Sequence, residues 1–279
     1  MSTDICVNLA NRQFADEEVT ILERAFSVGV THCILVANDL ASSHFLANWM
    51  IATAAGQGAR RLPICRSTVG VHPHDADNLD ADWLDQVRSI ALMPNVCAIG
   101  ETGLDFNRNY STQINQRRCF DAQIELAHEL QKPLLVHDRD SGGEVAARLA
   151  NANGGLPGVV IHCFTGSEDE LECYLKAGYY IGITGWVADQ KRGVELRRLV
   201  QRIPLEQLLI ETDAPFLRPQ NVPVDWQLAN NLSSRHKRRC EPAHLPFVID
   251  AIAASTRHSP EQISQATQKN AERLFNLEP

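Results

Sequence analysis

Short and nearly uninterrupted runs of Ile, Val, Leu and other apolar residues recur along the chain. Such a run presents apolar side chains on both faces of a strand, which is typical of a parallel sheet buried on both sides. The pattern predicts eight buried strands, at Ile5–Leu9, Cys33–Ala37, Ile64–Val71, Val96–Gly100, Pro133–Val136, Val159–Cys163, Tyr179–Ile183 and Leu208–Ile210.

Between these runs, apolar residues return at the three- and four-residue spacing that marks one face of an amphipathic helix. The segment Asp16–Val28 has this spacing and stops before Gly29, a residue type that commonly follows the end of a helix. The same spacing predicts helices over Thr112–Gln131 and Glu168–Ala177.

Strands that alternate with helices about every 25 to 35 residues are the pattern of a (β/α)8 barrel. A doubly wound open sheet is the alternative, but it usually carries a glycine-rich phosphate loop, and the chain has no G-x-G-x-x-G or G-x-x-x-x-G-K-[ST] motif. We therefore predict an α/β fold in which residues 1–279 form a single (β/α)8 domain. Pro215–Glu241 lacks apolar periodicity and is predicted to be a long loop after the eighth strand.

The composition, with 44% hydrophobic and 22% charged residues, is that of a globular protein. No apolar stretch approaches the ~20 residues of a membrane helix, and the N-terminus lacks a basic region followed by an apolar core, so neither a membrane span nor a signal peptide is predicted. The eight cysteines include no Cys-x-x-Cys pair, which excludes zinc-knuckle, iron–sulfur and thioredoxin motifs and favours reduced thiols in the cytoplasm.

The formal net charge of −8 argues against broad electrostatic adhesion to duplex DNA. It is compatible with an enzyme that holds a few phosphates through metal ions. One basic cluster, Arg235–Arg239, lies among polar residues and is either a solvated loop or a loop that contacts phosphate.

Polar side chains able to bind a metal follow five of the predicted strands. In a parallel barrel these positions meet at the C-terminal mouth, where barrel enzymes have their active sites. The intervals from Glu101 to His137 and from His137 to His162 each match one strand–helix unit. The residues concerned are His72, His74, Glu101, Asp105, His137, Asp138, His162, Glu211 and Asp213. Of these, Asp138 is more readily interpreted as a helix cap and Glu211 as a residue that orients its neighbours or caps a loop.

Mixed imidazole and carboxylate ligands suit divalent cations such as Zn, Mn, Co and Mg. A single His after a strand is more often a core or capping residue, but several such residues in barrel register favour a metal site. Glu101 is well placed to bridge two ions. The absence of G-x-S-x-G and H-E-x-x-H motifs excludes a serine-hydrolase elbow and that class of zinc protease. The predicted ligands are Glu101, His137, His162 and Asp213.

Several motifs resemble those of the TatD deoxyribonucleases, in the same order and over nearly the whole chain. Ile181–Val187 resembles the TatD branch of that family. The motifs are Gly70-Val71-His72-Pro73-His74, Ile99-Gly100-Glu101-Thr102-Gly103-Leu104-Asp105, Leu135-Val136-His137-Asp138-Arg139-Asp140, Ile161-His162-Cys163-Phe164-Thr165-Gly166, Glu211-Thr212-Asp213-Ala214-Pro215 and Glu241-Pro242.

The resemblance implies a TIM barrel of the metallo-dependent hydrolase type and a cytoplasmic, monomeric exonuclease that trims DNA, or RNA, from its 3′ ends. It implies that Glu101, His137, His162 and Asp213 bind the metal and that His72 lies near the scissile phosphate. We expect one or two divalent ions per site, Mg ahead of Mn or Zn, and Asp213 as the general base that accepts a proton from water. Two alternatives stay open: an amidohydrolase for a small amide or lactone, and a non-catalytic barrel that binds metal or nucleic acid.

The chain departs from most of these relatives at the end of the first strand. Where they carry His-x-His, this chain has Cys6 and Asn8. The TatD branch is similar to this chain in lacking that pair of histidines. Because an amide is a weaker ligand than imidazole, the number of bound ions stays open. The first and eighth strands of a closed barrel are neighbours, so Cys6 and Asn8 are expected to lie beside Asp213. Cys240 likewise stands where the family usually has Asn before Glu241-Pro242.

Overall fold

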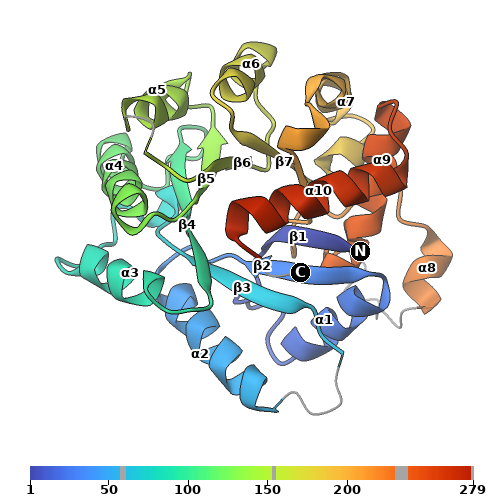
Figure 1. Ribbon diagram of the computed structural model, residues 1–279, viewed down its shortest axis with the longest axis horizontal. Helices are drawn as coiled ribbons and strands as arrows, with labels where there is room; N and C mark the ends of the chain where they lie inside the picture. Colours follow the sequence, from blue (N-terminus) through green and yellow to red (C-terminus); the bar gives the residue numbers. More distant parts are fainter. Residues whose placement is uncertain (57–60, 153–154, 230–237, 278–279) are drawn as a thin grey trace. The chain divides into compact units, whose positions relative to one another are not determined.

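Strands and helices alternate along the chain in the order of a (β/α)8 barrel, which confirms the predicted fold class (Figure 1). The structure is a computed structural model that describes residues 1–56, 61–152, 155–229 and 238–277. The strands are β1 (Ser2–Val7), β2 (Val30–Leu35), β3 (Ile64–Val69), β4 (Val96–Asp105), β5 (Leu134–Arg139), β6 (Val159–His162), β7 (Tyr180–Ile183) and β8 (Leu208–Ile210). The α-helices are α1 (Glu18–Ser27), α2 (Leu40–Gly56), α3 (Trp83–Ala91), α4 (Gln113–Leu130), α5 (Glu144–Asn151), α6 (Glu168–Lys176), α7 (Val194–Leu199), α8 (Val224–Ala229), α9 (Leu245–Ser255) and α10 (Pro260–Phe275).

The chain divides into two compact units. The first unit comprises Met1–Ile34, the described part of Gly58–Cys65, and Gly182–Ala271. The second unit comprises the described parts of Leu35–Gln57, Arg66–Ile181 and Glu272–Pro279. A single domain over residues 1–279 stays a prediction. Among the described residues, no helix is both long enough and apolar enough to cross a membrane.

In the second unit, β3, β4, β5 and β6 pair in parallel, each with the next, and β6 pairs with the start of β7. Helices α3 and α4 pack against β4, which buries the apolar runs that predicted these strands (Figure 1). Ile99, Leu135 and Val160 are fully buried. The residues at the ends of these strands are therefore supported by a rigid, close-packed core.

The register between β4, β5 and β6 aligns three positions. Gly103 is paired with His137, and His137 is paired with His162. Gly103 has φ +139, and a Cβ built there would lie 1.9 Å from the carbonyl oxygen of His137, so this close approach requires glycine. With glycine at this position, β4 stays paired as far as Asp105, beyond its predicted end at Gly100.

In the first unit, β1 lies beside β8, as expected for the two ends of a barrel. The N–H of Asp213 donates to the carbonyl oxygen of Cys6 at 3.0 Å, and the N–H of Asn8 donates to that of Ala214 at 2.8 Å. The prediction that Cys6 and Asn8 lie beside Asp213 is confirmed.

The prediction of one long loop over Pro215–Glu241 is wrong in part, because α8 (Val224–Ala229) lies within it. A helix of six residues has fewer than two turns, which is too short for a periodic apolar pattern to be recognised. Residues 235–237 of the basic cluster fall outside the described residues. Arg239, at its end, is buried and forms ion pairs with Glu17 at 3.0 Å and Glu241 at 2.8 Å, so this arginine has a structural role and is not a solvated or phosphate-contacting side chain.

Candidate metal centre

Glu101, His137 and His162 lie together at the ends of three neighbouring strands of the second unit. Oε1 of Glu101 is 2.9 Å from Nδ1 of His137 and 3.5 Å from Nε2 of His162. Glu101 and His162 are both buried, whereas the side chain of His137 is 20% exposed. Three of the four predicted ligands therefore meet around one carboxylate oxygen.

His72 faces the same carboxylate oxygen from the segment that follows β3. Its backbone N–H donates to Asn38 at 2.8 Å, and its Nδ1 accepts the N–H of His74 at 3.1 Å. Its Nε2 lies 3.3 Å from Oε1 of Glu101. Because Nδ1 is an acceptor, a neutral His72 carries its proton on Nε2 and is a hydrogen-bond donor at that atom.

Burial and mutual contact set the charges of this cluster. Burial raises the pKa of Glu101, but the nearby His162, His72 and His137 outweigh this and hold its pKa well below the ordinary value. Burial lowers the pKa of His72 to about 4. For His137, burial is outweighed by the carboxylates of Asp105 and Glu101, which raise its pKa to about 9. At neutral pH the carboxylates of Glu101 and Asp105 are therefore ionised, and the ring of His137 is protonated.

This donor set fits a divalent cation. Ligand-type atoms of Glu101, His137 and His72 lie within 4.8 Å of one another, and Glu101 and His137 are two of the predicted ligands. Imidazole nitrogens and a carboxylate oxygen are the ligands that Zn, Mn and Co accept. Without a metal ion, the proton on His137 balances the nearby carboxylates. A cation bound at Nδ1 of His137 would replace that positive charge.

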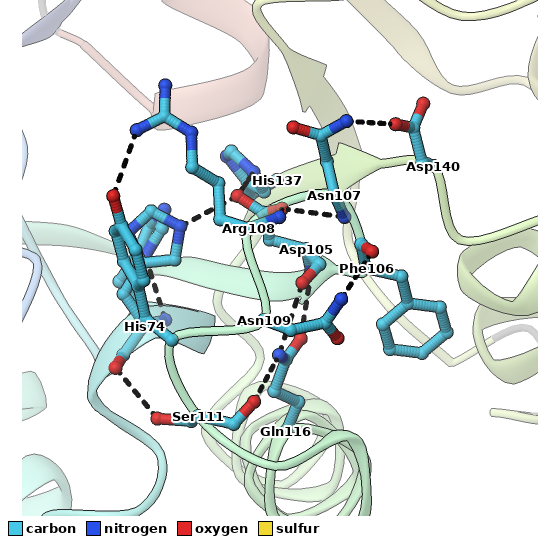
Figure 2. A network of polar contacts seen from close by, with 12 residues as sticks. His74, Asp105, Phe106, Asn107, Arg108, Asn109, Ser111, Gln116, His137 and Asp140 are labelled. Atoms are coloured by element: carbon cyan, nitrogen blue, oxygen red, sulfur yellow. Dashed lines mark hydrogen bonds and ion pairs between the residues drawn. The ribbon is translucent and has the colours of Figure 1, made fainter.

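Asp105 and His74 form a second layer behind His137 (Figure 2). Oδ2 of Asp105 is 2.7 Å from Nε2 of His74 and 3.4 Å from Nε2 of His137. Oδ1 of Asp105 accepts the backbone N–H groups of Asn107 at 3.1 Å and Arg108 at 2.8 Å. The His137 ring therefore lies between two carboxylates, with Nδ1 toward Glu101 and Nε2 toward Asp105.

His74 and Asp105 are among the polar residues noted after predicted strands, but they are not among the predicted ligands or catalytic residues. Their signal is spacing: residues i and i+4 of a strand lie on the same face, so Asp105 shares a face with Glu101. The contact of His74 with Asp105 joins two different strand–helix units, and no local pattern indicates it.

Asp213, the remaining predicted ligand, belongs to the first unit. The side-chain amide of Asn8 donates to its Oδ1 at 2.9 Å, and Sγ of Cys6 lies 3.7 Å from the same oxygen. The adjoining Thr212 donates its N–H and its hydroxyl to Asp4, at 2.9 and 2.6 Å. Burial raises the pKa of Asp4 to about 8. These bonds fix the orientation of the chain on both sides of Asp213.

Comparison with known proteins shows similarity over almost the full length. Residues 3–276 match the family described as TatD related DNase. The 3'-5' ssDNA/RNA exonuclease TatD of Citrobacter rodentium is 43% identical over 274 residues, which cover 98% of this chain and 97% of that protein. The enzyme of the same name from Salmonella typhimurium is 41% identical, with 98% of each chain covered.

A solved structure gives the same result for the fold. The crystal structure of YJJV, a TatD homologue from Escherichia coli, matches with a TM-score of 0.81 and 25% identity. The match covers 99% of this chain and 98% of that one. The sequence comparisons and the comparison of backbones therefore both find TatD proteins.

Proposed function

The chain belongs to the TatD related DNase family, and we propose that it is a divalent-metal-dependent hydrolase that removes nucleotides from the 3′ ends of single-stranded DNA or RNA. The names of relatives that align over 98% of the chain support this activity. The structural observation that carries the proposal is the convergence of three histidines on the buried carboxylate of Glu101.

Glu101, His137, His162 and Asp213 are the proposed metal-holding residues. A bound divalent ion lowers the pKa of a coordinated water and neutralises phosphate oxygens. Mg is the ion predicted from the resemblance, whereas imidazole donors favour Mn or Zn, because Mg prefers oxygen ligands. Metal preference is therefore part of the test.

His72 and Asp213 are the proposed catalytic residues. His72 is neutral at pH 7, because burial lowers its pKa to about 4. In the structure its Nε2–H faces Oε1 of Glu101 at 3.3 Å. With a metal ion bound to Glu101, this N–H would be available to donate to an oxygen of the scissile phosphate. Asp213 accepts the proton of the attacking water, and Asn8 orients that carboxylate through its bond to Oδ1.

We also propose that the enzyme is a monomer and that it is located in the cytoplasm. None of the eight cysteines, all of which are described, forms a disulfide. Reduced thiols are the usual state of cysteines in the cytoplasm, and this supports the proposed location.

The test uses end-labelled single-stranded DNA and RNA, linear and circular, with Mg, Mn, Zn or a chelator. We expect mononucleotides from linear strands, released progressively from the 3′ end, and no cleavage with chelator. Glu101→Gln should abolish release, whereas Glu129→Gln, an exposed residue of α4, is the matched control.

Three results would contradict the proposal. A circular strand cut as fast as a linear one would exclude an exonuclease. Turnover of small amides or lactones without oligonucleotide cleavage would favour an amidohydrolase. Metal or nucleic-acid binding without any turnover would favour a non-catalytic barrel.

A further inference from the structure

The loop Phe106–Thr112 follows β4 and is held in place by hydrogen bonds (Figure 2). Its first turn is closed by Asp105, whose Oδ1 accepts the N–H groups of Asn107 and Arg108. Its far end is tied to the metal centre by Ser111, whose hydroxyl donates to the carbonyl oxygen of His74 at 2.7 Å. These bonds restrain both ends of the loop at the edge of the site.

The side chain of Gln116, in α4, holds the loop through hydrogen bonds to the main chain near both of its ends. Its side-chain amide donates to the carbonyl oxygens of Ser111 at 2.9 Å and Asp105 at 3.2 Å. Its Oε1 accepts the N–H of Asp105 at 2.8 Å. Gln116 is fully buried, so these bonds are shielded from water.

This fixed loop presents an aromatic ring and a cation to solvent. Tyr110 is 64% exposed, and its ring centre lies 4.7 Å from that of His74, with the planes at 65°. The guanidinium of Arg108 lies 5.9 Å from the centre of the Tyr110 ring, and Nη1 is 3.4 Å from the hydroxyl. An exposed ring buries little apolar area, so apolar packing alone does not explain why Tyr110 occupies this position.

We propose that Tyr110 is a stacking surface for a base of bound single-stranded nucleic acid, with Arg108 as the cation beside it. The inference rests on the proposed exonuclease function and adds a binding subsite to it. Tyr110 touches His74, which shares the carboxylate of Asp105 with His137. A base on Tyr110 would therefore lie close to the metal centre, where a terminal nucleotide of the substrate must be held.

The chemistry of this pair favours nucleic acid as the ligand. Every base has a π-face, so an aromatic platform binds single strands with little dependence on sequence. Arginine beside the ring attracts phosphate and also stacks on bases. The formal net charge of −8 makes such a local cation important for a polyanionic substrate. A preformed loop also lowers the entropy cost of binding.

The test measures binding and turnover separately in Tyr110→Ala, Tyr110→Phe and the control Ile114→Ala. Ile114 lies on α4 and is 62% exposed, close to the value for Tyr110. Binding of a labelled single-stranded oligonucleotide is followed by fluorescence anisotropy in chelator, so that no cleavage occurs. KM and kcat are then measured with metal, on strands with a normal 3′ end and on strands whose 3′-terminal nucleotides are abasic.

Tyr110→Ala should weaken binding of the normal strand roughly 5- to 150-fold, the range for loss of one stacked base. KM should rise while kcat stays near the parent value, and Tyr110→Phe and Ile114→Ala should resemble the parent. On the abasic strand the difference between parent and Tyr110→Ala should disappear. Arg108→Ala should weaken binding of both strands.

Two outcomes would overturn the inference while the proposed function stands. One is equal binding of the normal strand by the parent and Tyr110→Ala. The other is a loss in Tyr110→Ala that is the same on the abasic strand, which would show that the ring acts through His74. If the parent neither binds nor cleaves single strands, the proposed function fails and the inference fails with it.

Discussion

Replacement of Asp105 by Asn tests whether the second carboxylate holds His137 in its metal-binding orientation. Oδ1 accepts the backbone N–H groups of Asn107 and Arg108, and the Asn amide oxygen can retain both bonds. The Asn amide nitrogen then takes the place of Oδ2, opposite Nε2 of His74 and Nε2 of His137. An acceptor for two imidazoles becomes a donor, while the size and shape of the side chain stay the same.

The magnitude follows from the burial and bonding of these groups. Asp105 is 2% exposed, and its bonds from His137, His74 and the N–H of Arg108 outweigh burial and hold its pKa well below the ordinary value. Loss of a hydrogen bond to a charged group costs about 1.5–3 kcal/mol. The His74 side chain is 26% exposed and can turn to water, which offsets part of this cost. We therefore expect the free energy of unfolding to fall by about 1–3 kcal/mol.

The effect on metal binding is expected to be of similar size in free energy, because a 10- to 100-fold loss of affinity corresponds to about 1.4–2.8 kcal/mol. Removal of the group that orients a metal-binding His typically costs ~10–100-fold in metal affinity or activity. Asp105→Asn should therefore bind Mn or Zn about 10- to 100-fold more weakly by titration calorimetry. In the metal-free protein, the ¹⁵N shifts of the His137 ring should titrate at lower pH, because Asp105 is one of the two carboxylates that raise the pKa of His137 to about 9.

Asp77→Asn is the matched control for Asp105→Asn. Asp77 accepts hydrogen bonds from Thr112, just before α4, and from Asn115 within it, and its replacement makes the same change of charge. It should leave metal affinity unchanged. Parent-like metal affinity and parent-like ring shifts in Asp105→Asn would refute the argument that this carboxylate orients His137.

The remaining predictions concern the cluster, the first strand and pH. Glu101→Ala should abolish metal-dependent hydrolysis with the circular dichroism spectrum retained, and a near-parental rate would show that Glu101 does not hold the metal. Cys6→His combined with Asn8→His should tighten Zn or Mn binding in calorimetry, because imidazole is a better ligand than an amide; unchanged affinity with a lowered Tm would indicate overpacking instead. Burial, aided by nearby arginines, lowers the pKa of His244 to about 3 from 6.5, so the stability it contributes is present above pH 6.5 and declines as the pH falls toward 3. Between pH 7 and 5 the parent should therefore lose about 2 kcal/mol more unfolding free energy in urea titrations than His244→Gln, and equal losses would contradict this.

The sequence predicts well those features that depend on burial along the chain. β8 has its predicted bounds, Leu208–Ile210, because an apolar run enclosed by polar residues marks a buried strand. The meeting of His137 with His162 is also predictable, since consecutive parallel strands place their ends together. The family resemblance adds the roles of such residues, which spacing alone leaves open.

Features that depend on contacts between distant segments are not predictable in this way. Arg239 lies in a polar segment, and its burial depends on Glu17, far away in the sequence. The sharing of Asp105 by His74 and His137 depends on how two strand–helix units pack. These geometries follow from tertiary packing, of which a single sequence carries no local sign.

The close approach of Gly103 to the carbonyl group of His137 has a consequence for the kinds of ion the enzyme can discriminate. The main chain of β4 is pressed against that of β5 at the level of the proposed ligands, so the distance between Glu101 and His137 has little freedom to expand or contract. A pair of ligands at a fixed separation selects cations by radius as well as by chemical softness, and Ca²⁺, which prefers flexible coordination by several oxygens, is poorly matched to such a pair. If Glu101 and His137 hold the metal as proposed, ion selectivity depends on this backbone spacing as well as on the ligands themselves.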